Sequence, residues 1–192
     1  MKNTFLFILC FFSLSVIAQD HAIVKKINGI VTSSGRNLSI GDRIKIGEIV
    51  DASGKGSFVD LEIPGEGKMR LVGGVMRVKK VEKTESIYEL IKGKIFTYLK
   101  PDKKTEKRLR IYTSEGSFAV RGTKFVVVKE KDYRSFLCVC EGSVEAKNNF
   151  GVNGIVHENQ EVEFSGVDRD IRSKINSRDM KKLRAMFKKM GL

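Results

Sequence analysis

Residues 117–128 read Ser-Phe-Ala-Val-Arg-Gly-Thr-Lys-Phe-Val-Val-Val, which is two apolar runs joined by Arg121-Gly122-Thr123. Runs of β-branched and aromatic residues around a glycine predict two strands and a sharp turn. Phe125 to Val128 is apolar at consecutive positions, and Phe136 to Cys140 follows the same pattern. A strand that is apolar on both faces is covered on both faces. We therefore expect these two runs to be central strands.

Outward from this stretch, most of the chain alternates apolar and polar residues in short runs. Period-two alternation of this kind is typical of antiparallel sheets with one buried face. Pro64-Gly65 and Gly73-Gly74 interrupt the pattern and are expected to end strands. The sequence predicts an all-β domain over residues 22–165, an antiparallel β-sandwich or β-roll of many short strands. The runs lie at 40–47, 58–63, 69–72, 75–78, 88–91 and 94–99.

The C-terminal residues 166–192 change to a helical pattern and are expected to form a basic amphipathic tail. Met180, Leu183, Met186, Phe187 and Met190 share one face of an α-helix. Ser177 or Asp179 can cap its start, and Gly191 ends it. The stripe is expected to pack on the β body. Alternatively, the helix lies on an anionic membrane, through Lys181, Lys182, Arg184, Lys188 and Lys189.

Residues 1–18 have the pattern of a secretory signal peptide. Lys2 precedes an apolar run from Phe5 to Ile17, and small residues follow up to Ala18. The apolar run is shorter than the roughly 20 residues that a bilayer crossing needs. We expect cleavage after Ala18, a periplasmic or secreted protein, and no transmembrane span in the mature chain.

The net charge of +13 indicates either an anionic partner or an inert basic surface that keeps the chain soluble. Export argues against nucleic acid and favours an envelope protein, an anionic lipid or a polysaccharide. The segment from Lys100 to Arg110 is the most basic one between strands, and we interpret it either as a solvated hairpin loop or as an anionic contact surface. Its cations are Lys100, Lys103, Lys104, Lys107, Arg108 and Arg110.

The sequence has little that predicts catalysis. It holds two histidines, and we find no nucleophile elbow, phosphate loop or metal-binding helix motif. We expect neither an enzyme nor a cofactor. A Cu(II) site at His21 becomes available only if cleavage follows Ala18, because the new amine, two amides and the imidazole then offer four nitrogens.

Cys138 and Cys140 lie two positions apart on one strand face. Their Cα atoms are about 6.6 Å apart in an extended strand, at the far limit for a disulfide. Buried free thiols are therefore expected. Such a pair of thiols is chemically able to bind Cu(I).

The order and spacing of three motifs within residues 50–147 resemble the FecR domain family. Residues 117–127 are similar to the family's strand, V-R-G-T-x-F turn and strand element. Residues 139–144 (Val-Cys-Glu-Gly-Ser-Val) resemble its V-x-E-G-x-V hairpin, and residues 90–95 resemble its L-x-x-G-x strand entry. The residues that match the motifs are Gly93, Arg121, Gly122, Thr123, Phe125, Glu141 and Gly142.

We interpret these motif residues as structural. Gly122 and Gly142 can adopt positive φ in a sharp turn. Thr123 can bond to local backbone, and Arg121 can pair with a carboxylate such as Glu141. Nothing in the motif requires chemistry on a substrate.

The resemblance implies a β module that recognises another molecule in the cell envelope. The regulators that give the family its name also carry a cytoplasmic anti-sigma segment and a membrane span, and here a predicted signal peptide stands in that place. The leading hypothesis is therefore an exported, non-catalytic binding module for an envelope protein, with a role in envelope signalling or assembly. The alternative is a binder of anionic lipid, lipopolysaccharide or wall polymer.

Overall fold

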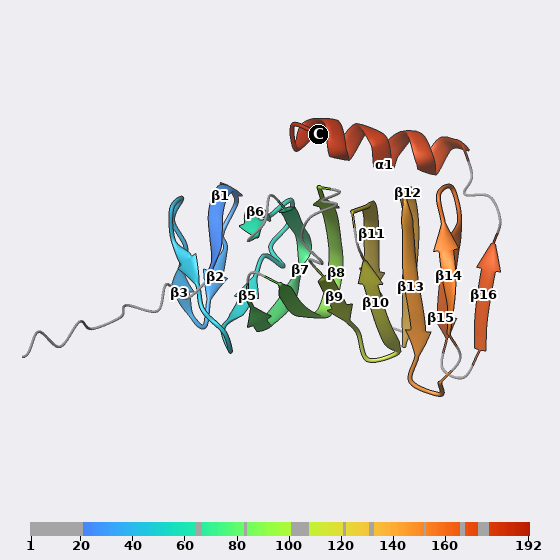
Figure 1. Cartoon of the computed structure of the whole chain (residues 1–192). Helices are drawn as coiled ribbons and strands as arrows, with labels where there is room; N and C mark the ends of the chain where they lie inside the picture. Colours follow the sequence, from blue (N-terminus) through green and yellow to red (C-terminus); the bar gives the residue numbers. More distant parts are fainter. Residues whose placement is uncertain are drawn as a thin grey trace, which may run out of the picture.

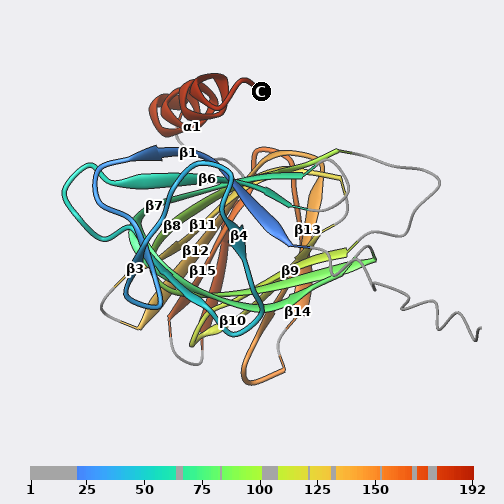
Figure 2. The same ribbon diagram turned by 90° about the vertical axis from the view of Figure 1, so that its left-hand side faces the viewer.

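The computed structural model describes residues 21–63, 67–82, 84–100, 108–120, 122–130, 133–151, 153–165, 168–172 and 177–192. The strands in these residues form one continuous hydrogen-bonded sheet that folds over into two layers, with one helix outside (Figures 1 and 2). The all-β prediction with a C-terminal helix is confirmed. None of the helical structure described is long and apolar enough to span a membrane.

Layer A is the part of the sheet that the helix covers. Its ladder runs β1-β6-β7-β8-β11-β12-β15-β16, and β4 extends it by pairing with the start of β1. All neighbouring pairs in this layer are antiparallel. Its strands are β1 (Ala22–Asn28), β4 (Arg43–Ile44), β6 (Phe58–Ile63), the first half of β7 (Gly67–Val81), the second half of β8 (Glu85–Leu99), β11 (Lys124–Lys129), β12 (Arg134–Glu141), β15 (Glu161–Ser165) and β16 (Asp168–Arg172).

Layer B lies on the other side of the core. Its ladder runs β3-β2-β5-β7-β8-β9-β10-β13-β14, and the β8–β9 pair is parallel. Its remaining strands are β2 (Thr32–Ser33), β3 (Arg36–Asn37), β5 (Ile49–Asp51), β9 (Arg108–Tyr112), β10 (Gly116–Val120), β13 (Ser143–Asn148) and β14 (Asn153–His157).

The β7–β8 hairpin belongs to both layers because it bends at glycines. A Cβ on Gly74 would lie 2.2 Å from the carbonyl oxygen of Lys92, and a Cβ on Gly93 would lie 2.4 Å from the Cα of Gly74. Gly93 also has a φ of 94°, which favours glycine. The expectation that Gly73-Gly74 ends a strand is therefore wrong. The strand continues and changes layer at this point.

The main core fills the space between the layers. One buried cluster draws on strands from β1 to β15, and it includes Val24, Tyr88 and Phe164. Phe118 of layer B stacks on Phe164 of layer A, with ring centroids 5.5 Å apart. The layers thus form a single structural unit.

The runs that are apolar at consecutive positions are covered on both faces, as the sequence predicts. In β11, Phe125 and Val127 point into the main core, and Val126 belongs to a second cluster. In β12, Leu137 points inward, and Cys140 lies in the second cluster. The helix supplies the cover on the outer face.

Helix α1 (Ser177–Lys189) lies across the outer face of layer A (Figures 1 and 2). Its stripe residues Met180 and Phe187 are buried against Phe96 and Val126. Gly191 has a φ of 76°, and the Leu192 amide bonds to the Phe187 carbonyl at 3.1 Å. This Schellman-type cap ends the helix where the sequence predicts it.

Two expectations about connections are wrong. Residues 168–172 form strand β16, paired with β15, so the helical tail begins only at Ser177. Four of its five residues are charged (Asp168, Arg169, Asp170 and Arg172), which is typical of an edge strand. The segment from Lys100 to Arg110 does not close a hairpin, because β8 and β9 are parallel. It connects layer A to layer B.

Candidate functional site

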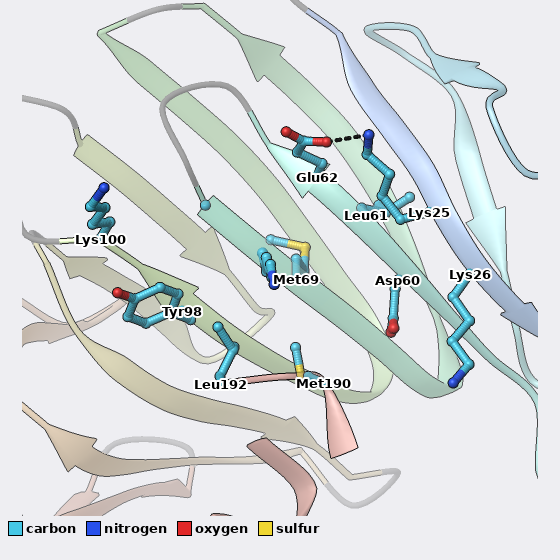
Figure 3. A pocket seen from close by; sticks show the side chains of 12 residues that line it. Lys25, Lys26, Asp60, Leu61, Glu62, Met69, Tyr98, Lys100, Met190 and Leu192 are labelled. Carbon is cyan, nitrogen blue, oxygen red and sulfur yellow. Dashed lines mark ion pairs between the residues drawn. The ribbon is translucent and has the colours of Figure 1, made fainter. Parts of the chain in front are cut away.

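A half-open groove of about 610 Å³ lies on the outer face of layer A, beside the C-terminal end of α1 (Figure 3). Strands β1, β6, β7 and β8 form its floor, and the last helical turn and its cap form one wall. Its size is in the range of small-molecule and peptide sites. It is lined by Lys25, Lys26, Asp60, Leu61, Glu62, Gly67, Lys68, Met69, Tyr98, Lys100, Met190 and Leu192.

A cross-strand row places polar side chains on this floor. Glu62 pairs with Lys68, Lys68 with Tyr98, and Tyr98 with Lys124 on the next strand. Directly opposed residues in a sheet share a face, so these four side chains stand side by side. The Lys124 ammonium lies 5.4 Å from the centre of the Tyr98 ring.

The groove has an excess of positive charge. Four lysines line it, and its two carboxylates already have cationic partners. Glu62 forms an ion pair with Lys25, drawn in Figure 3, and Asp60 forms one with Arg70. Lys68 is exposed and has no ion-pair partner among the described residues. An anionic group would therefore be attracted to this groove.

A buried arginine connects the groove to the helix. The Arg70 side chain is only 3% exposed, and its guanidinium donates to the Asp60 carboxylate with an Nη2–Oδ2 distance of 2.7 Å. The same guanidinium lies 4.3 Å from the centre of the Phe58 ring and 3.5 Å from the Met186 sulfur. Arg70 thus holds the last turns of α1 against β6 and β7.

The arrangement suits binding of a segment that is both anionic and apolar. Tyr98, Met190 and Leu192 offer apolar surface, and lysines surround them. Within the described ranges, no group of three or more histidine, cysteine, aspartate or glutamate residues is placed to hold a metal ion.

The motif glycines lie in two turns, with Gly122 between β10 and β11 and Gly142 between β12 and β13. Gly122 has a φ of 66° and Gly142 one of 87°. A Cβ on Gly142 would lie 2.7 Å from the Thr123 side chain, so the two turns touch. The expected hydrogen bond of Thr123 is absent among the described residues, where its buried hydroxyl has no partner. Glu141 pairs with Lys124 at 3.0 Å.

The other motif residues have different positions. Phe125 is fully buried in the main core, and Gly93 lies at the bend of β8. Arg121 lies outside the described residues, so its expected pairing with Glu141 stays a prediction.

The cations of the segment from Lys100 to Arg110 do not form one surface in the described residues. Lys100 lines the groove on layer A, whereas Arg108 and Arg110 belong to β9 in layer B. Arg110 donates to the Tyr112 hydroxyl at 3.2 Å. Lys103, Lys104 and Lys107 lie outside the described residues.

The helix cations are exposed, and Arg184 among them borders the sheet, where it lines a small pocket with Lys124 and Cys140. This exposed set is Lys181, Lys182, Arg184, Lys188 and Lys189. Lys182 forms an ion pair with Asp179 at 3.1 Å. Because the apolar stripe packs on layer A, the basic side of the helix is exposed to solvent with no exposed apolar face beside it.

Both cysteines are free thiols, as expected. Burial raises the pKa of Cys138 to about 12 and that of Cys140 to about 11. His21 is half-buried just before β1, and the residues that would complete its copper site, Gln19 and Asp20, lie outside the described residues.

Sequence reasoning missed Lys25, Lys26, Lys68 and Tyr98. A signal for them exists in β8, where Phe96 and Tyr98 are two aromatic residues on the face opposite Ile95 and Leu99. Large apolar residues on both faces of a strand indicate a covered outer face, and therefore a wall beside the polar positions.

The chain is similar to known proteins in sequence and in fold. Residues 52–145 match the family model described as FecR protein. Two crystal structures from Parabacteroides distasonis ATCC 8503, each described as a "putative anti-sigma factor", are similar in fold. One has 18% sequence identity and a TM-score of 0.56, and the match covers 67% of this chain and 61% of that chain.

The second structure also has 18% identity, with a TM-score of 0.52 and coverage of 74% and 59%. The present chain thus spans about three fifths of the length of these proteins, and the likeness shows the fold alone. No curated protein matches the sequence.

Proposed function

This chain belongs to the FecR family through residues 52–145, and from that premise we propose that it is an exported, non-catalytic module that binds a protein partner in the cell envelope. The groove beside α1 is the binding site in this proposal. Its partner segment is acidic and carries an apolar side chain. Binding serves envelope signalling or assembly.

The composition of the groove is the observation that carries the proposal. Four lysines surround an apolar surface, and both carboxylates of the lining are neutralised by cations. Charge complementarity of this kind steers a partner and sets its register. The apolar part, contributed by Tyr98 and Met190, supplies the buried contacts on which affinity depends.

Two further observations support a protein partner in the envelope. The pattern of residues 1–18 supports export, and the two structures of similar fold are each described as a "putative anti-sigma factor", a description that favours a protein partner. The packed stripe of α1 supports a protein partner over a lipid one, since that apolar face is already occupied by the sheet.

Site-specific photo-crosslinking in the producing cell tests this function. A photoreactive phenylalanine analogue replaces Tyr98 in the groove. The matched control replaces Tyr112, which lies on the outer face of layer B. We expect a defined envelope protein to be captured from position 98 and to be absent at position 112. Capture of lipid or polysaccharide alone at position 98, or of the same proteins at both positions, would contradict the proposal.

A further inference from the structure

The interface between α1 and layer A is rich in sulfur. The buried cluster there contains Cys140 and Met180, and the partly buried Cys138, Met186 and Met190 pack against it. Methionine adapts to irregular gaps, and buried cysteine acts as a small apolar residue. Packing alone, however, does not require two thiols and a thioether at one end of the interface.

Strand β12 turns both thiols toward the helix. Leu137 and Val139 point into the main core, so Cys138 lies on the opposite face. A register shift between Lys124 and Phe125 of β11 leaves Cys140 at a bulge, where it is 7% exposed. The two thiols therefore share one covered side of the strand.

Helix α1 packs over this pair of thiols. Arg184 and Phe187 of the helix line a small pocket together with Cys140. Asp179, near the start of the helix, acts electrostatically on Cys138. Met180 follows Asp179, is 8% exposed, and belongs to the same buried cluster as Cys140. Met180 belongs to the buried part of this cluster, whereas Met186 and Met190 are only partly buried.

The spacing of the thiols suits an ion better than a disulfide. Alternate residues of a regular strand have Cα atoms about 6.6 Å apart, near the upper limit for a disulfide, and both thiols are free here. Two metal–sulfur bonds of about 2.3 Å each allow the sulfur atoms to be up to about 4.6 Å apart. Thiolate and thioether ligands together select Cu(I) among biological metals.

We propose that Cys138, Cys140 and Met180 form a binding site for one Cu(I) ion beneath α1. The two thiols lose their protons and bind as thiolates, and the Met180 sulfur completes the coordination. One Cu(I) enters and two protons leave, so no oxidant or reductant takes part. This site is separate from the groove and does not depend on the proposed function.

Proton release makes binding dependent on pH. Burial is the main cause that raises the pKa of both thiols, and Glu161 of β15, which accepts from the Cys138 thiol at 3.7 Å, adds to it for Cys138. The other charged groups that act on the thiols are Asp179, Arg184, Lys124, Glu158 and Glu141. Because two protons leave, the apparent affinity is expected to rise about 100-fold per pH unit below the thiol pKa values.

Competition for Cu(I) tests the site directly. The full-length mature protein, reduced and free of oxygen, is titrated with Cu(I) against the chromophoric chelator bathocuproine disulfonate. We expect one Cu(I) per chain in the wild type, loss of this binding in Cys138→Ser and in Cys140→Ser, and weaker binding in Met180→Leu. The matched control Met190→Leu changes a methionine at the far end of the same helix and is expected to bind as wild type.

X-ray absorption at the copper edge of the wild-type complex keeps the proposal testable if a cysteine variant does not fold. A first shell made only of sulfur is expected. A shell with nitrogen or oxygen donors would overturn the site, and so would wild-type stoichiometry in the double variant Cys138→Ser/Cys140→Ser or the lack of any competitive binding.

Discussion

The two apolar clusters of this molecule differ in composition and in the elements that they hold together. The main core between the layers is built from valine, leucine, isoleucine and phenylalanine of nearly every strand. The cluster under α1 is smaller, contains cysteine and methionine, and borders the buried Arg70–Asp60 pair. The first is a scaffold. The second joins one helix to one face of that scaffold.

This difference suggests how the family fold acquires a specific function. The main core needs all its strands at once, so it unfolds as a unit. The cluster under α1 can be lost by undocking one helix, because the strands keep their hydrogen-bonded ladder and the main core without it. Binding sites are drawn from such regions of low local stability. Both the groove and the proposed Cu(I) site lie at the helix–sheet interface.

The largest effect is expected from a truncation in the main core. Phe118→Ala removes a fully buried ring that stacks on Phe164. Loss of such a ring lowers the free energy of unfolding by about 3–5 kcal/mol. Urea unfolding followed by circular dichroism measures this value. A loss below about 1 kcal/mol would show that the layers do not share one core.

A slightly smaller effect is expected where an ion pair joins the layers. Glu115 of layer B and Lys129 of layer A are 3.0 Å apart and almost fully buried. Glu115→Gln leaves the Lys129 ammonium without its carboxylate partner. This lowers the free energy of unfolding by about 3 kcal/mol. The Lys129 ammonium keeps its hydrogen bond to the Glu130 carbonyl oxygen at 2.8 Å, which limits the loss of stability. Unfolding of Lys124→Ala, which breaks an exposed pair, is the control.

The same ion pair predicts a dependence on pH. Burial by itself raises the pKa of Glu115, but hydrogen bonds from Ser135, Lys129 and Ser114 outweigh burial, so the pKa is lowered overall. A lowered pKa adds stability above the unfolded value, near 4.5, and this stability is lost as pH falls through the folded value. Acid unfolding of Glu115→Gln should therefore show a weaker dependence on pH below about 4.5. An unchanged slope would show that Glu115 does not contribute.

A mutation in the helix is expected to have a limited effect on global stability. Phe187→Ala removes the edge-to-face contact with Phe96, whose ring centroid is 5.9 Å away. The body remains folded once α1 undocks, so the loss cannot exceed the free energy of docking the helix and should be smaller than that of Phe118→Ala.

Thiol labelling gives the local readout for this variant. Burial keeps the pKa of Cys140 near 11, and undocking exposes the thiol to water. Cys140 should therefore react faster with a thiol reagent in Phe187→Ala than in the wild type or in Lys188→Ala, an exposed control on the same helix. Equal rates in all three would mean that the helix does not protect the thiols.

The smallest effect on stability is expected from the groove. Lys68 is exposed, so Lys68→Glu should change the free energy of unfolding by less than about 0.5 kcal/mol. The capture of a protein partner from position 98 should nevertheless be lost, because the charge of the floor is reversed. Retained capture would place the partner elsewhere.

Vesicles containing anionic lipid distinguish the lipid alternative. Because the stripe of α1 is packed on the sheet, we expect no binding by the wild type and none after deletion of residues 177–192. Binding that this deletion abolishes would favour a lipid surface as the partner.

The sequence predicts those parts of the fold that follow from local patterns. The consecutive apolar residues of β11 and β12 indicate two covered faces, and the stripe from Met180 to Met190 identifies the helix that covers one of them. The pattern cannot show that a strand passes through Gly74 and Gly93 from one layer to the other, because a glycine that bends a strand looks the same as one that ends it.

The groove could not be predicted because it depends on long-range register. Lys68 and Tyr98 are thirty positions apart and meet only through the β7–β8 pairing. The basic segment beginning at Lys100 drew attention by its composition, yet its described cations lie on two different layers. Composition shows which residues are charged, but only the pairing of the strands shows where those residues lie in the fold.

Native-state hydrogen exchange tests most directly the division into a cooperative scaffold and a separable helix. The amides of α1 are expected to exchange through an opening that costs clearly less free energy than global unfolding, and the amides of β8 and β11 are expected to exchange only through global unfolding. If α1 exchanges with the same free energy as β8 and β11, the helix belongs to the scaffold and the distinction between the two clusters is wrong.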